Sequence, residues 1–143
     1  MPESFASLTI QRRIEWSDTD ASGRWHNTAA FRMVEWAETA LLERLGILDD
    51  VYAYLPRAHV EADFLCALDF RDLVDATITV TNVGTTSLAY DFTIDRRGER
   101  CVTMKVVAVL IDRDRNARPW PDRHRALLTQ SGPQPPELFV VES

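Results

Sequence analysis

The sequence predicts an α+β domain in which an antiparallel β-sheet wraps around one long central helix. The first observation is a single long segment, 27–45, whose apolar residues recur at helical spacing in a broad stripe. The second is that most other periodic segments alternate apolar and polar residues, as strands with one buried face do. A sheet packed on one covered helix satisfies both patterns, and 143 residues are enough for one core.

The chain starts with a strand and a loop. Residues 8–16 (LTIQRRIEW) alternate, with Arg12 as the exception on the apolar parity, and predict a half-buried strand. Residues 17–26 (SDTDASGRWH) are dense in turn-forming residues and predict a loop.

The helix is expected over 27–45, capped by Asn27 or Thr28 and ended by Gly46. So broad an apolar face predicts a helix that is covered on most sides. Its apolar stripe consists of Phe31, Met33, Val34, Trp36, Ala37, Ala40, Leu41 and Leu45. Its wetter side consists of Arg32, Glu35, Glu38, Thr39 and Glu43.

The rest of the domain is expected to be mainly strands, at 59–64, 73–83, 87–95 and 99–112. The last three are separated by short turns containing Gly84 and Gly98, and they predict an antiparallel meander. Residues 119–128 have room for one helical turn.

The predicted domain covers residues 1–131. Residues 132–143 contain three prolines and then an apolar patch at 138–141, and they are expected to be a flexible tail or to dock on a partner subunit. A sheet with one helix on one face leaves its edge strands exposed. Edge pairing between two copies would relieve this, so a homodimer or a dimer of dimers is expected.

The net charge of −6 argues against nucleic acid or an anionic membrane as a partner. An anionic ligand then requires a local basic cluster, which the 16 basic residues, all arginine except Lys105, are sufficient to form. The N-terminus lacks the pattern of a signal peptide, and the longest apolar run, 106–111, is too short to span a bilayer. A cytoplasmic location is expected.

The two cysteines, Cys66 and Cys101, lie in apolar, strand-like surroundings and are expected to be reduced core residues. No His, Cys or acidic cluster has the spacing of a zinc site, and neither a nucleophile elbow nor a glycine-rich phosphate loop is present. The sequence therefore predicts no bound metal and no cofactor.

The segment that carries chemistry is 18–27 (DTDASGRWHN), which joins the first strand to the N-terminus of the buried helix. A helix N-terminus offers unpaired N–H groups and a positive dipole end, which together stabilise an oxyanion. Asp20 lies a few residues upstream and is the candidate nucleophile or general base. Gly23 lets the backbone turn sharply and approach a ligand. Thioester hydrolysis needs these two parts and no strong general acid.

The residues Asp18 to Gly23, followed by His26-Asn27, Phe31-Arg32 and Glu35, resemble the opening of the 4-hydroxybenzoyl-CoA thioesterase-like hot-dog family. A weaker likeness covers 65–72, and the resemblance extends to about residue 112. It implies a hot-dog fold and hydrolysis of an acyl-CoA or acyl-carrier-protein thioester to free acid and thiol.

The resemblance also implies roles for individual residues. The second Asp of the D-x-D pair is the catalytic carboxylate, which places that role on Asp20. The oxyanion donor is a backbone N–H at the start of the helix, which falls on Asn27. Many members have an aromatic residue or His there and a Tyr three residues later, where this chain has Ala30. This departure affects acyl-group specificity and leaves a backbone donor intact.

Further site residues are weighed against structural roles. The residues assigned to substrate binding are Gly23, Trp25, His26, Phe31 and His59. His26 fits a polar cap of the helix equally well, His59 is more often structural on a strand, and the two aromatics fit the core. Glu35 on the helix is the second choice for the catalytic carboxylate, and Asp18 is expected to be structural.

Two other readings of the loop remain. A D-x-D-x-S-G run also opens a calcium loop, but the twelfth position would be Ala29, where a bidentate Glu is required. In the other reading, the two aspartates only shape a solvated turn and cap the helix. At the level of function, the alternatives are a non-catalytic acyl-binding module and a hot-dog hydratase or dehydratase.

Overall fold

The computed structural model describes residues 4–139 and contains one five-stranded antiparallel sheet. The strands are β1 (Ser7–Arg13), β2 (Arg57–Phe64), β3 (Leu73–Val83), β4 (Ser87–Arg96) and β5 (Glu99–Val109). Their spatial order is β1-β3-β4-β5-β2, so β1 and β2 form the two edges. The predicted meander of three long strands is confirmed as β3, β4 and β5, which pair in sequence order.

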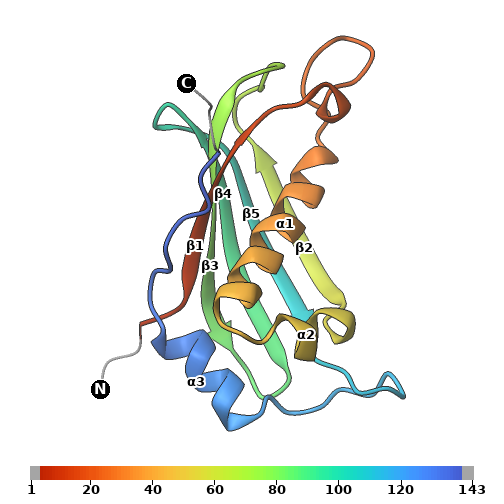
Figure 1. Ribbon diagram of the computed structural model, residues 1–143. Coiled ribbons are helices and arrows are strands. Elements are labelled where there is room, and N and C mark those ends of the chain that lie inside the picture. Colours follow the sequence, from red (N-terminus) through yellow and green to blue (C-terminus); the bar gives the residue numbers. More distant parts are fainter. Residues whose placement is uncertain (1–3, 140–143) are drawn as a thin grey trace.

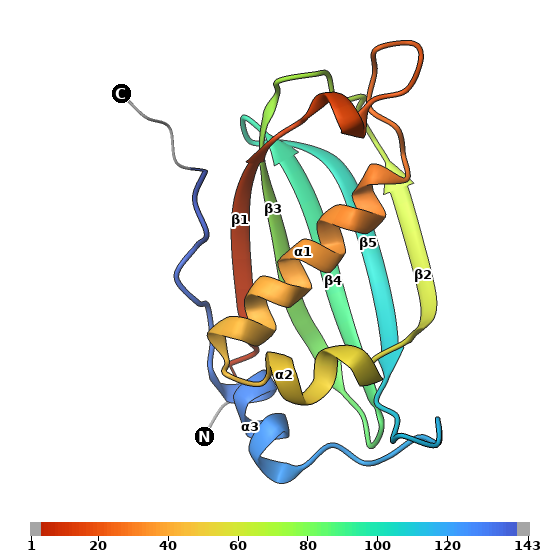
Figure 2. The same cartoon turned by 45° about the vertical axis from the view of Figure 1, so that its right-hand side comes forward.

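The long helix α1 (Ala29–Arg44) runs diagonally across one face of the curved sheet (Figures 1 and 2). This is the predicted α+β arrangement. The alternating apolar side chains of β1 and β3–β5 face α1 and form the core with the buried side of the helix. The strand residues of this core include Leu8, Ile10, Val74, Ala76, Ile78, Val80, Leu88, Tyr90, Phe92, Ile94, Val102, Met104, Val106 and Ala108.

Short helices lie around this core. They are η1 (Trp16–Asp18), α2 (Leu48–Val51), η2 (Tyr52–Tyr54) and α3 (Asp122–Gln130). The expectation of a single helical turn near 119–128 is wrong, because α3 has nine residues. Its buried residues His124 and Leu128, four positions apart, hold one side of it against the body. None of the helices described within residues 4–139 is long and apolar enough to cross a membrane.

Element boundaries differ from expectation where the backbone finds partners outside the sheet ladder. The first strand ends at Arg13 instead of residue 16, since the Ile14 N–H donates to the Asp72 carbonyl at 2.8 Å. Trp16 then enters η1 and is 71% exposed. At the other end of the sheet, β5 stops at Val109, three residues before the expected end at 112.

The apolar stripe expected on the helix was too wide. Phe31 and Trp36 are 41% and 48% exposed, and Trp36 lies beneath the guanidinium of Arg12, 3.2 Å from its ring centroid. Conversely, Glu38, expected on the wetter side, points inward and forms an ion pair with Arg57 of β2 at 2.7 Å. A partner for the carboxylate explains this, because a buried charge is tolerated when it is paired.

The chain after α3 returns along the outer edge of β1. The Gln134 N–H donates to the Ser7 carbonyl at 2.8 Å, and the Glu137 N–H donates to the Thr9 carbonyl at 2.9 Å. The described part of the predicted tail therefore covers one edge of the sheet. Residues 140 and 141 of the apolar patch lie outside the described residues.

Candidate active site

The loop between η1 and α1 contains a tight turn that begins at Asp20. The Asp20 N–H donates to the Arg24 carbonyl at 2.9 Å, and the Gly23 N–H donates to the Asp20 carbonyl at 2.9 Å. Thr19 and Trp25 then form an antiparallel bridge that closes the loop. Gly23 has φ +79°, a left-handed conformation that a side chain would strain, and this explains the glycine.

The segment 65–72, between β2 and β3, packs against this loop and bonds to its backbone. The Trp25 N–H donates to the Leu68 carbonyl at 3.0 Å, and Arg24 forms an isolated bridge with Asp69. Trp25 and Leu68 are both buried. The part of the sequence with the weaker resemblance is thus the platform on which the Asp20 loop rests.

Asp18 has a structural role, as expected. Its Oδ2 accepts a hydrogen bond from the Glu15 N–H at 2.8 Å and completes the capping box of η1. Its Oδ1 forms an ion pair with Arg32 of α1 at 3.0 Å. Both carboxylate oxygens therefore have partners that fix the loop to the helix.

Asp20 is arranged differently. Its Oδ1 accepts hydrogen bonds from the Ser22 N–H at 2.8 Å and from the Ser22 hydroxyl, while Oδ2 has no partner among residues 4–139. The hydrogen bonds from Ser22, first from its side chain and then from its backbone, lower the pKa of Asp20. The side chain is exposed and charged at neutral pH, with one oxygen held by Ser22 and the other open to solvent.

The start of α1 leaves one backbone donor unpaired. The N–H groups of Ala29 and Ala30 donate to the carbonyls of His26 and Asn27 at 2.9 and 3.1 Å. The Thr28 N–H donates to Nδ1 of His26 at 3.2 Å. Within the described chain, the N–H of Asn27 has no acceptor. It lies at the electropositive end of the 16-residue helix α1.

His26 caps the helix start. Its ring Nδ1 accepts a hydrogen bond from the Thr28 N–H and lies 2.6 Å from the Thr28 hydroxyl. The backbone N–H of His26 donates to the Asp18 carbonyl at 2.8 Å. Of the two roles considered for His26, the cap is the one with visible contacts. The ring itself is exposed beside Asn27.

The structure brings most of the expected site residues into one loop but separates others. Asp20, Gly23, Trp25, His26 and Asn27 are contiguous with the start of α1, where Phe31 lies exposed in the first turn. Trp25 is buried, and its indole N–H has no partner in the described chain. Glu35 is exposed on α1, with no hydrogen bond to another residue in the range 4–139.

His59 lies apart from this loop. It pairs with Glu61 at 2.8 Å, and Glu61 stands opposite Lys105 on the face of the sheet that points away from α1. The period of two along a strand explains this placement, since Val60 and Ala62 take the face toward the helix.

The sequence did not predict that three polar residues from α1, β2 and β4 come together beside the helix. Glu38, Arg57 and Tyr90 form a polar cluster between α1 and the sheet, with Tyr90 1% exposed. Burial, and next the charge of Glu38, raise the pKa of Tyr90 well above its usual value. Ser22 was also missed, although the spacing Asp-x-Ser is the known signal for a side chain that bonds the backbone two residues on.

Basic and aromatic side chains gather next to the loop. A cavity of about 370 Å³ is lined by Arg12, Arg13, Ile14, Glu15, Trp16, Phe70, Arg71 and Phe139. A second cavity of about 370 Å³ shares Arg13 and Arg71 and adds Arg96 and Arg97. The two cavities together are lined by five arginines and three carboxylates, so this part of an acidic chain carries a local excess of basic side chains.

The strand order and the central helix define the hot-dog fold. The structure of a predicted thioesterase from Bacillus stearothermophilus superimposes with a TM-score of 0.77 at 22% identity, over 85% of this chain and 93% of that one. A 1,4-dihydroxy-2-naphthoyl-CoA thioesterase from Synechocystis gives a TM-score of 0.75 at 19% identity, over 85% and 95% of the two chains.

Similarity in sequence points to the same group. A 1,4-dihydroxy-2-naphthoyl-CoA hydrolase from Prochlorococcus marinus is 27% identical, over 75% of this chain and 77% of its own length. No family model matches the chain. The resemblance to the hot-dog thioesterases inferred from the loop is confirmed by these relatives.

Proposed function

We propose that this protein hydrolyses an acyl-CoA thioester to the free acid and CoA, with Asp20 as the catalytic carboxylate. One observation carries the proposal. The loop at the start of α1 contains both an Asp20 carboxylate oxygen and an Asn27 backbone N–H that have no hydrogen-bond partner among residues 4–139. A carboxylate and an oxyanion donor are the two parts that thioester hydrolysis requires. The relatives named as CoA hydrolases support the same reaction.

Two routes use these groups. In the first, the Asp20 oxygen attacks the thioester carbonyl, the C–S bond breaks to release the CoA thiolate, and water hydrolyses the resulting anhydride. In the second, Asp20 takes a proton from a water molecule, which attacks the carbonyl instead. The Asn27 N–H stabilises the oxyanion in either route. Both routes need the charged form of Asp20, which its lowered pKa maintains at neutral pH.

The substrate we propose is a CoA ester of a hydroxylated aromatic acid. Two relatives are named for the same substrate, 1,4-dihydroxy-2-naphthoyl-CoA. Exposed aromatic residues beside the loop, Phe31, Trp16 and Phe70, offer surfaces for a flat ring. The arginines of the adjoining cavities, among them Arg12, Arg13 and Arg71, suit the phosphates of the CoA tail.

We also propose that the active unit is a homodimer formed through β2. The opposite edge of the sheet is covered by residues 133–137, whereas the outer edge of β2 is unpaired in the part of the chain that is described. The start of α1 lies beside the end of β2 in both views, so a partner at this edge adjoins the Asp20 loop (Figures 1 and 2). A second chain would then enclose the exposed carboxylate.

The test is a panel of aromatic and aliphatic CoA thioesters, assayed by release of free thiol. The Asp20→Asn variant is expected to lose roughly two to four orders of magnitude in kcat, the range for losing a catalytic base or nucleophile. Asp91→Asn is the matched control, because Asp91 is an exposed carboxylate on the far face of the sheet. It is expected to keep wild-type activity.

Full activity in Asp20→Asn would disprove the assignment of this carboxylate. Saturable binding of CoA esters without thiol release, in the wild type as well, would favour the non-catalytic acyl-binding module. Hydration of an enoyl thioester without hydrolysis would favour the hydratase alternative.

A further inference from the structure

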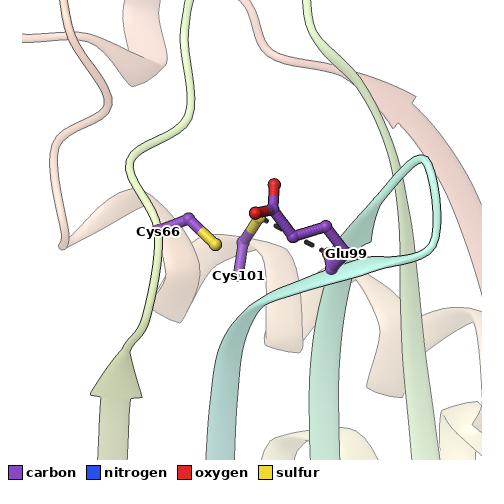
Figure 3. Close-up of side chains that lie close together, drawn as sticks. All are labelled: Cys66, Glu99 and Cys101. Atoms are coloured by element: carbon purple, nitrogen blue, oxygen red, sulfur yellow. Dashed lines mark hydrogen bonds between the residues drawn. The ribbon is translucent and has the colours of Figure 1, made fainter.

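Two cysteines and a glutamate that are distant in the sequence meet at the end of the sheet near the Asp20 loop. Cys66 follows β2, while Glu99 and Cys101 begin β5. One ligand atom from each of the three side chains lies within 4.8 Å of the other two (Figure 3). The cluster is partly accessible, since Cys101 is buried, Cys66 is half-buried and Glu99 is exposed.

The backbone holds the two thiols close together. The N–H groups of Leu65 and Cys66 both donate to the Cys101 carbonyl, at 2.7 and 3.3 Å. The Cys66 thiol donates to the Arg100 carbonyl at 3.2 Å. The spacing of the sulfur atoms is therefore set by main-chain bonds between the two segments, and the site is largely preformed.

The cluster brings together three groups that become anionic. Arg96 contacts Oε1 of Glu99 at 2.9 Å and is shared with Asp72, also at 2.9 Å. The second oxygen of Glu99 has no hydrogen-bond partner among residues 4–139.

We propose that Cys66, Cys101 and Glu99 bind one thiophilic divalent cation of the Zn²⁺ class. Two cysteine sulfurs and one carboxylate oxygen are ligands that Zn²⁺ accepts, at about 2.3 Å for sulfur and about 2.0–2.2 Å for oxygen. Ligand atoms around a tetrahedral ion of this size lie roughly 3.3–3.8 Å apart. The spread of the three groups is compatible with that geometry after small side-chain rotations.

The carboxylate distinguishes a cation site from a simple dithiol. A disulfide between Cys66 and Cys101 would make no use of Glu99, whereas a cation uses all three groups. Three protein ligands leave the fourth position to water, which the exposure of Glu99 permits.

A bound cation would brace the platform beneath the Asp20 loop. Cys66 lies in the segment 65–72, whose Leu68 carbonyl accepts the Trp25 N–H. Tying Cys66 to β5 through the ion would restrict the movement of this segment. The role is one of positioning, and the site itself does not depend on the proposed hydrolase activity.

The test is a titration of the reduced, chelator-treated full-length protein with Co²⁺, a spectroscopic substitute for Zn²⁺. We expect one Co²⁺ per chain, a thiolate-to-cobalt charge-transfer band, and loss of that band when Zn²⁺ is added. Cys66→Ser and Glu99→Gln are each expected to weaken binding by more than the roughly 10–100-fold typical of a supporting group. Bound Zn²⁺ is expected to raise the Tm of the wild type.

Glu61→Gln is the matched control, since Glu61 is an exposed glutamate on the outer face of β2, and it should bind as the wild type does. Variants are compared by circular dichroism before titration, and Cys66→Ser, which changes the more accessible cysteine, keeps the test valid if Cys101→Ser does not fold. Absence of the charge-transfer band in the reduced wild type would overturn the proposal. So would a Cys66–Cys101 disulfide in a protein that binds no Co²⁺ once reduced.

Discussion

Asp18 and Asp20 are chemically identical residues that the loop puts to different uses. Asp18 has both oxygens occupied, one by the Glu15 N–H and one by Arg32. Asp20 has one oxygen held by Ser22 and the other free. The difference arises because Asp18 contacts the helix, whereas Asp20 begins the turn in which the Gly23 N–H donates to the Asp20 carbonyl. Local hydrogen bonding therefore makes Asp20, and not Asp18, the candidate for the proposed catalytic role.

The pH dependence of activity follows from the same contacts. Ser22 holds the pKa of Asp20 below its ordinary value of 3.8, so the reactive carboxylate is lost only as the pH falls below that range. Replacing Ser22 with Ala removes the side-chain hydrogen bond, and the acid limb of the kcat/KM profile should move to higher pH. Profiles of wild type and Ser22→Ala, with folding checked at each pH, measure this. Coincident acid limbs would show that Ser22 does not control the titration.

At the scale of elements, the two edges of the sheet are treated differently. The chain after α3 donates backbone hydrogen bonds to β1 and covers that edge. On β2, the Leu65 N–H donates to Cys101 of β5, so the alternation of a strand directs the N–H groups of Val60 and Ala62 away from β5. These outward groups are the ones available to a second chain.

Proline substitutions in β2 distinguish N–H groups that point away from β5 from N–H groups that point toward it. Ala62→Pro removes an outward N–H and should convert the proposed dimer to monomer while the fold is retained. Glu61→Pro removes an N–H that points toward β5 and should lower the Tm instead. Light scattering after size exclusion gives the mass, and thermal unfolding gives the Tm. A dimeric Ala62→Pro protein with an unchanged Tm would place the interface elsewhere.

The whole molecule is a one-helix, one-sheet domain whose proposed site is open in the single chain. Asp20, His26, Asn27 and Phe31 are all exposed at one end of α1. Exposure weakens electrostatic stabilisation of an oxyanion, because water screens the helix dipole. A partner at β2 would exclude water from this end of the molecule, so activity and assembly are expected to be linked.

Assembly should also show in stability. If the folded dimer dissociates on unfolding, mass action makes the Tm rise with protein concentration. The rise should be visible when the concentration is varied over about a hundred-fold range. Calorimetry of the wild type at several concentrations measures this, and thiol-release assays at the same dilutions should show activity falling as the dimer dissociates. A Tm and a specific activity that are both independent of concentration would indicate a monomeric enzyme.

Particular residues show how far sequence reasoning reached. The periods of the strands predicted the meander, and the loop 18–27 was placed correctly at the start of the buried helix. Phe31 and Trp36 were placed on the buried stripe of the helix, with Phe31 also assigned to substrate binding, but both are exposed. Periodicity reports polarity and spacing, but not what lies opposite. Glu38 was assigned to solvent for the same reason, since its partner Arg57 comes from another element.

The sequence by itself determined the elements, their order and the loop that carries Asp20, because turn chemistry and apolar periodicity act over a few neighbouring residues. Only the tertiary structure decided which groups from distant segments meet. It joined Cys66 to Glu99 and Cys101, set the platform 65–72 beneath the loop, and left β2 as the unpaired edge. The physical reason is that strand pairing brings together residues whose separation along the chain has no local signature.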